Sequence, residues 1–126
     1  MFFSQVILTF LFVLEILVIK GKITSPTEDG AFGAFAVALA LYGLIKLDDK
    51  IGACFNPAVG LVQSIYGVME LQHSGLYSAS TLTRYMWAYI LGPAIGGLLA
   101  GIAQLFHRGA VGKVAASAAG ADRLLD

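Results

Sequence analysis

Asn56-Pro57-Ala58 lies between two strongly apolar stretches and directly follows a charged loop. Asn56 carries a side-chain amide, and Pro57 suits the first turn of a helix. A helix that begins inside a bilayer points its unpaired N–H groups and the positive end of its dipole at whatever lies near the bilayer middle. The tripeptide in this setting therefore predicts a short helix that starts within a membrane, as in a pore or in a structure descended from one.

The composition is typical of a membrane protein. Apolar residues make up 58% of the 126 residues and charged residues 13%, against roughly 45–50% and about 25% in ordinary soluble proteins. The mean hydropathy is +0.81. Eight basic and eight acidic residues cancel, so the charge gives no indication of a nucleic-acid partner. Cys54 is the only cysteine, so no disulfide can form within the chain.

A bilayer requires about 20 consecutive apolar residues in a helix that crosses it. Three stretches approach this length, and they cover residues 2–19, 31–47 and 85–106. Residues 57–68 form a weaker apolar stretch that would rise only ~18 Å as a helix, so we predict a re-entrant half-helix there. Residues 70–80 are polar and rich in turn-forming residues. The expected fold is an all-α integral membrane domain over residues 1–106, followed by an exposed tail, 107–126, that is at most partly helical.

The basic residues predict the orientation of the chain. With three crossings, the loop 20–29 and the tail lie on one side of the membrane. That side holds five basic residues and the other side holds three, which favours the tail side as cytoplasmic or matrix-facing. The two groups are Lys20, Lys22, Arg108, Lys113 and Arg123 on the tail side, and Lys46, Lys50 and Arg84 on the other.

Three motifs in this order resemble the C-terminal half of an aquaporin, a member of the major intrinsic protein family. Residues 5–10, Gln-Val-Ile-Leu-Thr-Phe, resemble the family's Glu-x-x-x-Thr-Phe opening, with Gln5 in place of the glutamate. Residues 49–58 resemble the loop into the second NPA motif, which here is Asn56, Pro57 and Ala58. Residues 87–97, Trp-Ala-Tyr-Ile-Leu-Gly-Pro-Ala-Ile-Gly-Gly, resemble the sixth-helix signature.

The resemblance covers residues 3 to about 106. It implies a half-aquaporin repeat with three transmembrane helices and one re-entrant half-helix, in which Gln5 anchors the backbone of the NPA loop. Asn-Pro-Ala-Val, residues 56–59, is the usual form of the family's first NPA box, so descent from the first half stays open. Gly92-Pro93 and the loop at Asp49 favour the second half.

Three positions of the family's selectivity filter can be carried over to this chain, and all are apolar. The family has Arg directly after the second NPA box, where this chain has Val59. Many water-selective members have His twelve residues before the NPA asparagine, where this chain has Leu44, and a third position falls at Ala53. An Arg donor and its fixed charge exclude protons and cations in such pores. The resemblance therefore implies a filter that is leaky, dry or absent.

An aquaporin pore consists of two inverted repeats, and these residues hold one. Because the first span begins almost at Met1, we expect no leading half. Alone, the repeat would expose Asn56 and the start of the half-helix to lipid, where each unpaired polar group costs several kcal/mol. We therefore expect the chain not to be a monomer, but to pair within the bilayer with itself, with a second half-repeat or with other membrane subunits.

The remaining polar and small residues predict structure rather than chemistry. Glu15 is expected to extend toward the inner interface, although a proton-relay role stays open. His73 and His107 are isolated, so we expect no metal site, no cofactor and no catalytic residue, and the chain is not expected to be an enzyme. Four glycines of the third span are expected to form a helix-packing face, namely Gly92, Gly96, Gly97 and Gly101.

Two functions follow as hypotheses. The first is a structural, accessory transmembrane subunit of a larger membrane complex, built on a degenerate half-aquaporin that does not conduct alone. The complex we hypothesise is a mitochondrial respiratory complex of the inner membrane, where small accessory subunits without cleavable presequences are common. The alternative is a channel for water or small neutral solutes, rebuilt by pairing with a second half, and the intact Asn56-Pro57-Ala58 favours it.

Overall fold

The structure is a computed structural model that describes residues 1–49, 52–75 and 79–122. Within these residues the chain is all-helical, as predicted, with four helices and no strand. The helices are α1 (Phe2–Lys20), α2 (Gly30–Leu47), α3 (Pro57–His73) and α4 (Ala79–Asp122). Three of them, α1, α2 and α4, are long and apolar enough to cross a membrane, as the sequence predicts, which is compatible with an integral membrane protein.

Polar side chains define where two of the helices begin. The Asp29 carboxylate accepts hydrogen bonds from the N–H groups of Ala31 and Phe32, which caps α2. The Asn56 amide oxygen accepts a hydrogen bond from the Ala58 N–H at 2.9 Å, and Pro57 occupies the first position of α3. Both caps satisfy N–H groups that have no partner within the helix.

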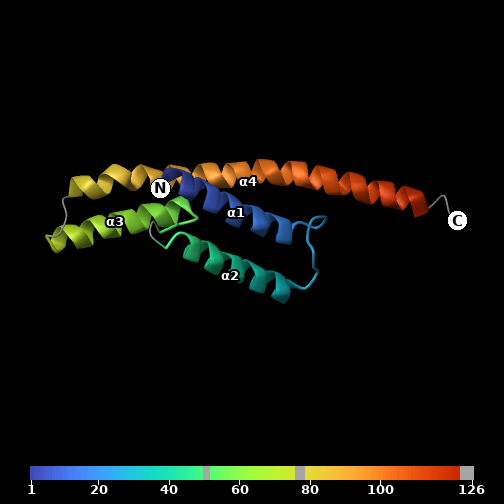
Figure 1. The fold of residues 1–126 in the computed structure, drawn as a ribbon, viewed down its shortest axis with the longest axis horizontal. Helices are drawn as coiled ribbons and strands as arrows, with labels where there is room; N and C mark the ends of the chain where they lie inside the picture. Colours follow the sequence, from blue (N-terminus) through green and yellow to red (C-terminus); the bar gives the residue numbers. More distant parts are fainter. Residues whose placement is uncertain (50–51, 76–78, 123–126) are drawn as a thin grey trace.

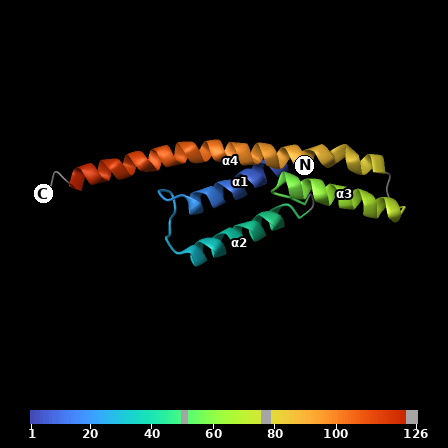
Figure 2. The same ribbon diagram turned by 180° about the vertical axis from the view of Figure 1, so that it is seen from behind.

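The long helix α4 organises the molecule. In both ribbon views α4 runs along one side, α1 lies against its middle, and α3 lies beside its N-terminal part (Figures 1 and 2). α2 packs on α1 and less extensively than α1 packs on α4. The helices α1 and α4 run in the same direction, and the Phe2 ring lies 5.2 Å from the Trp87 ring where their contact begins.

Two boundaries differ from the sequence predictions. The helix expected over residues 57–68 begins at Pro57 but continues to His73. It therefore takes in part of the segment predicted to be turn-rich, of which residues 76–78 lie outside the described residues. The tail, predicted to be at most partly helical, is helical as far as Asp122, because α4 continues unbroken beyond residue 106. Alanine, the strongest helix former, is frequent in this tail, which accounts for the continuation despite its glycines.

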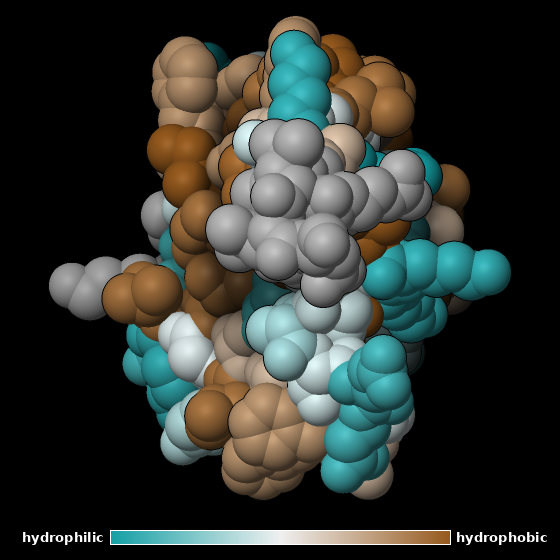
Figure 3. Space-filling view, turned by 90° about the vertical axis from the view of Figure 1, so that its right-hand side faces the viewer, coloured by the Kyte–Doolittle hydropathy of each residue, from teal (hydrophilic) through white to brown (hydrophobic). Residues whose placement is uncertain are grey.

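The buried core is small, and much of the apolar surface is open. The buried apolar residues are Leu8, Leu44, Cys54, Ala88 and Ala100. Large apolar side chains such as Phe35 and Leu98 are 66% and 70% exposed. Figure 3 views the molecule from the end where α4 terminates, and hydrophilic side chains project around that end with hydrophobic surface between and behind them. This distribution suits a molecule whose sides face lipid or other membrane helices.

Candidate functional site

Gln5 holds the backbone of the loop that leads into α3. Its side chain is fully buried. The Gln5 Nε2 donates a hydrogen bond to the Gly52 carbonyl at 3.2 Å, and its Oε1 accepts one from the Cys54 N–H at 3.2 Å. One amide thus pairs with a backbone acceptor and a backbone donor two residues apart. This is the position at which the sequence resemblance implies a loop anchor.

Pro93 makes a backbone carbonyl of α4 available for a second contact with the same loop. A proline inside a helix has no N–H, so the carbonyl four residues earlier loses its helical partner. In α4 that carbonyl belongs to Tyr89, and the Cys54 thiol lies 3.3 Å from it, within hydrogen-bonding distance. The same thiol lies 3.4 Å from the Gln5 Oε1. We call Gln5, Gly52, Cys54 and Tyr89 the loop-anchor cluster.

Two glycines allow the helices to approach this cluster closely. A Cβ added to Gly60 of α3 would collide with the backbone carbonyl of Tyr89. A Cβ added to Gly92 of α4 would lie 2.6 Å from the Gln5 Cβ. The lack of a side chain at these positions therefore lets α3 and α1 pack directly on α4. The sequence analysis did not identify Gly60 as a packing residue. The signal that could have identified it is a glycine one turn after the start of the helix.

The residues next to the cluster present the start of α3 at the surface. Phe55 has a φ of 55°, a left-handed conformation that is uncommon for a residue with a side chain. Its ring packs 5.3 Å from the Phe12 ring, which helps to hold the turn. Asn56 follows and is exposed. Its oxygen is used by the helix cap, while its Nδ2 forms no hydrogen bond within the described part of the chain.

A buried carboxylate beside the cluster was not found from the sequence. Asp48 is 6% exposed, and its Oδ1 accepts a hydrogen bond from the Ser4 hydroxyl at 3.0 Å. Its Oδ2 is buried without a hydrogen-bond partner among the described residues. The charged sequence around Asp48 is typical of a solvated loop, so composition alone gave no signal for its burial.

The three positions that the sequence resemblance assigns to a filter differ in their exposure. Leu44 is buried near the end of α2, Ala53 is partly buried in the loop, and Val59 in the first turn of α3 is 41% exposed. None of the three brings a hydrogen-bonding side chain. Val59 lines a shallow, mainly apolar hollow together with Ala58, Val62 and Gln63.

Two of the four glycines predicted to form a helix-packing face lie against α1. Gly96 packs against α1, where an added Cβ would lie 2.5 Å from the Val6 carbonyl, and Gly92 packs beside it. Among the described residues no atom of another element lies within 4 Å of a Cβ added to Gly97 or Gly101. Four-residue spacing keeps Gly92 and Gly96 on one side of the helix, whereas residues one position further are turned away by about 100°.

A second polar contact closes the opposite end of the α1–α4 interface. Gln104 is 6% exposed, and its Nε2 donates to the Leu17 carbonyl at 3.0 Å and to the Thr24 hydroxyl at 3.1 Å. Its Oε1 lies 3.4 Å from Nδ1 of His107. A lone glutamine near the end of an apolar span was a usable signal that the sequence analysis passed over.

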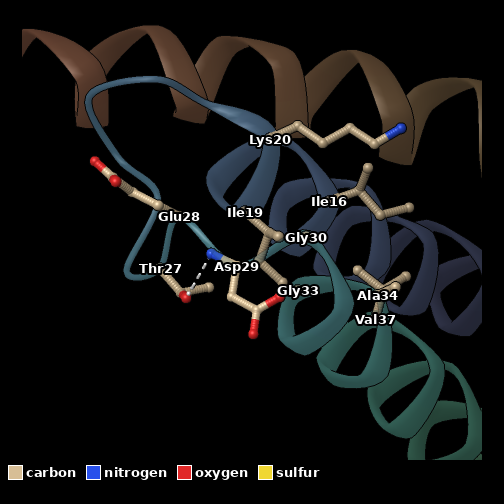
Figure 4. Close-up of a pocket in the computed structure, with 10 residues that line it drawn as sticks. All are labelled: Ile16, Ile19, Lys20, Thr27, Glu28, Asp29, Gly30, Gly33, Ala34 and Val37. Atoms are coloured by element: carbon tan, nitrogen blue, oxygen red, sulfur yellow. Dashed lines mark hydrogen bonds between the residues drawn. The ribbon is translucent and has the colours of Figure 1, made fainter.

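A groove of about 480 Å³ lies between α1 and α2 near the loop that joins them (Figure 4). In the close-up, Ile16, Ala34 and Val37 project from the two helices, while the charged ends of Lys20 and Glu28 point away from each other. The Asp29 N–H donates to the Thr27 hydroxyl at 3.1 Å at one edge. The groove is therefore mainly apolar, with charge confined to its rim.

The described residues contain no group of three His, Cys, Asp or Glu side chains placed to hold a metal ion. The polar groups of the loop-anchor cluster bond to one another and to backbone atoms, which suits holding a loop. In comparisons with known proteins, no protein-family model, no curated protein and no solved structure matches this chain.

Proposed function

We propose that this chain is a degenerate half-aquaporin that does not conduct by itself and serves as a structural transmembrane subunit of a larger membrane assembly. The observation that carries the proposal is the division of polar groups. The hydrogen-bonding side chains near Asn56 hold the loop, whereas Leu44, Ala53 and Val59 offer no donor or acceptor to a permeating molecule.

The level of Asn56 along α4 supports a half-helix that begins near the bilayer middle. Residues 85–106 of α4 carry no charge and lie between Arg84 and Arg108, and as a helix they are about 33 Å long, close to the hydrocarbon thickness. Gly60 lies against Tyr89, and Asn56 lies one turn before Gly60. α3 and α4 run in opposite directions (Figure 1). Asn56 is therefore level with about residue 93, within roughly two turns of the middle of this stretch.

At that depth the exposed start of α3 needs a covering partner. The Asn56 side chain is exposed, and its NH₂ group forms no hydrogen bond with any residue that the structure describes. A polar group left unpaired in hydrocarbon costs several kcal/mol. A polar group of another subunit placed over Asn56 removes this cost, which favours a subunit of an assembly over a chain that stands alone in lipid.

The same exposed asparagine also favours the second candidate, a channel for water or small neutral solutes that forms when a second half-repeat covers it. An inverted half would bring a second helix start to Asn56 and complete a polar path. The apolar side chains Leu44 and Val59 oppose this function, because water passing them would lose hydrogen bonds without replacement.

Osmotic shrinkage of liposomes that contain the purified chain tests whether the chain, alone or paired with itself, conducts water. We expect a water permeability equal to that of empty liposomes. Permeability well above this baseline that is lost in Asn56→Leu would support the channel hypothesis and contradict the proposed subunit function. Asn56→Ser is the matched control, because its hydroxyl keeps a cap for α3 and separates loss of a pore from loss of the helix start.

Native gels and membrane fractionation test the remaining parts. The chain is expected in a complex much heavier than its 13.3 kDa, and a mitochondrial inner membrane stays the hypothesis for its location. Migration as a single chain would contradict the subunit proposal.

A further inference from the structure

Glu15 is a carboxylate inside the apolar helix α1, and nothing in the described part of the chain pairs with it. No hydrogen bond or ion pair joins its side chain to another described residue. Its environment is only partly buried. Ionisable residues within spanning helices are rare because they are costly, and they commonly pair with one another or face a polar interior.

The contacts of α1 place Glu15 inside the hydrocarbon zone. The Leu17 carbonyl bonds to Gln104, so Glu15 is level with about residue 102 of α4. The charge-free stretch of α4 ends at Phe106, about 6 Å further along the helix axis. Glu15 therefore lies roughly one turn inside the end of the apolar stretch.

The sequence alone suggested that Glu15 extends to the inner interface, but the direction of α1 opposes this. Side chains on a helix tilt toward its N-terminus, and the N-terminus of α1 lies toward the Asn56 level, where Gln5 holds the loop. The Glu15 side chain therefore starts out toward the bilayer middle. Snorkelling is a property of the long Lys and Arg side chains, and a glutamate has fewer methylenes with which to turn back.

The neighbouring helix supplies no donor either. Ile19, one turn beyond Glu15, contacts Gly33 of α2. Because the two helices are joined by a short loop and run in opposite directions, Val37 lies near the level of Glu15. The partly buried residues of α2 around it, Ala36, Val37, Ala40 and Leu41, have no polar side-chain atom.

We propose that Glu15 is the docking point for one Lys or Arg on a transmembrane helix of a partner subunit. This inference rests on the proposed function and adds the chemistry of the partner. A long basic side chain reaches across the apolar surface of α1 and α2 with its stem and places its charge against the carboxylate. Charge complementarity then removes the cost of the isolated carboxylate and fixes the depth at which the partner binds.

The probe is a synthetic Leu/Ala transmembrane peptide with a single Lys at the level of Glu15, compared with the same peptide carrying Leu there. Energy transfer between the labelled full chain and each peptide in liposomes measures association. The Lys peptide is expected to bind the chain roughly 3- to 15-fold more tightly than the Leu peptide, within the range measured for polar contacts between membrane helices.

Variants of the full chain test whether Glu15 causes this preference. Glu15→Gln is expected to abolish it, and Glu15→Asp, which keeps the charge, to retain most of it. Leu11→Gln is the matched control, because it places an amide at an exposed position of the same span and is expected to change nothing. Equal binding of the Lys and Leu peptides, or a preference that persists in Glu15→Gln, would overturn the proposal.

The same variants in native membranes separate this inference from the proposed function. Glu15→Gln is expected to release the chain from its complex on native gels, whereas Leu11→Gln is not. A complex that survives Glu15→Gln overturns the docking role and leaves the subunit function standing. The water permeability of liposomes that contain the chain is measured independently. Permeability above that of empty liposomes that is lost in Asn56→Leu would contradict the proposed function.

Discussion

The amide of Gln5 does what a carboxylate at the same position cannot do. The Gly52 carbonyl requires a donor and the Cys54 N–H requires an acceptor, and an amide carries both. An ionised glutamate has acceptors only. Glutamate is the residue that the aquaporin family has in the motif that residues 5–10 resemble. An amide at position 5 therefore suits a loop that is held by direct contacts within this chain.

Truncating Gln5 is expected to loosen the loop. Gln5→Ala removes the partner of the Gly52 carbonyl, which lies at an exposed residue, and of the buried Cys54 N–H, and the buried group alone costs about 1–3 kcal/mol. The lone thiol of Cys54, 6% exposed, reports this locally through its rate of alkylation by a maleimide. We expect much faster alkylation in Gln5→Ala and an intermediate rate in Gln5→Glu. An unchanged rate in both variants would mean that Gln5 does not hold the loop.

Residue by residue, the sequence predicted what lies in motifs and missed what depends on distant neighbours. The place of Gln5 against the loop and the helix start at Pro57 were predicted from motifs, whereas the cap that Asn56 provides was not. The burial of Asp48 depends on Ser4, which is 44 residues away, and no local pattern encodes it. Pro93 has no N–H to donate to the Tyr89 carbonyl, as simple helix geometry predicts, but the contact of that carbonyl with the Cys54 thiol was apparent only in three dimensions.

At the scale of elements, α4 carries two kinds of glycine. Gly92 and Gly96 meet α1 backbone or Cβ atoms, while Gly97 and Gly101 meet no other element among the described residues. The adjacent pair Gly96 and Gly97 therefore provides a comparison in which position along the membrane is constant and only the contact differs.

Gly96→Leu is expected to separate α1 from α4, because its side chain would enter the space now held by the Val6 carbonyl and the Thr9 Cβ. Overpacking of this kind costs about 1–3 kcal/mol or more. Gly97→Leu is the control and is expected to leave the melting temperature in detergent near that of the unchanged chain. Equal destabilisation by both substitutions would show that the open side of α4 is also packed, as by a partner or a second copy.

Helix starts were easier to predict than helix ends. Pro57 after Asn56 marks the first turn of α3 through its fixed φ and missing N–H. No residue of comparable strength ends the helix at Val68, so it continues to His73. The apolar pattern likewise predicted which part of α4 is apolar enough to cross a membrane. A helix does not have to end where its apolar stretch ends, and the Ala-rich sequence continues α4 to Asp122.

At the scale of the whole molecule, α4 is far longer than a bilayer is thick. Its 44 residues rise about 66 Å, against a hydrocarbon core of about 30 Å. α1 covers only the part of α4 between Trp87 and Gln104, and the remainder extends past α1 at the C-terminal end (Figure 1). A helix of this length in a membrane therefore projects into water at its C-terminal end, where Arg108 and Lys113 lie.

This geometry predicts opposite locations for Ser74 and Ala115, both exposed. Ser74 follows the end of α3 beside the N-terminal part of α4, and Ala115 lies beyond the level of α1. In sealed vesicles, a membrane-impermeant maleimide added outside is expected to label one of Ser74→Cys and Ala115→Cys and to spare the other until detergent is added. The unchanged chain, whose Cys54 is buried, gives the background.

Because five basic residues against three favour the tail side as internal, Ser74→Cys is expected to be the labelled variant in right-side-out vesicles. Labelling of both variants from one side would mean that α4 does not cross, since no other helix lies between the two positions in the chain.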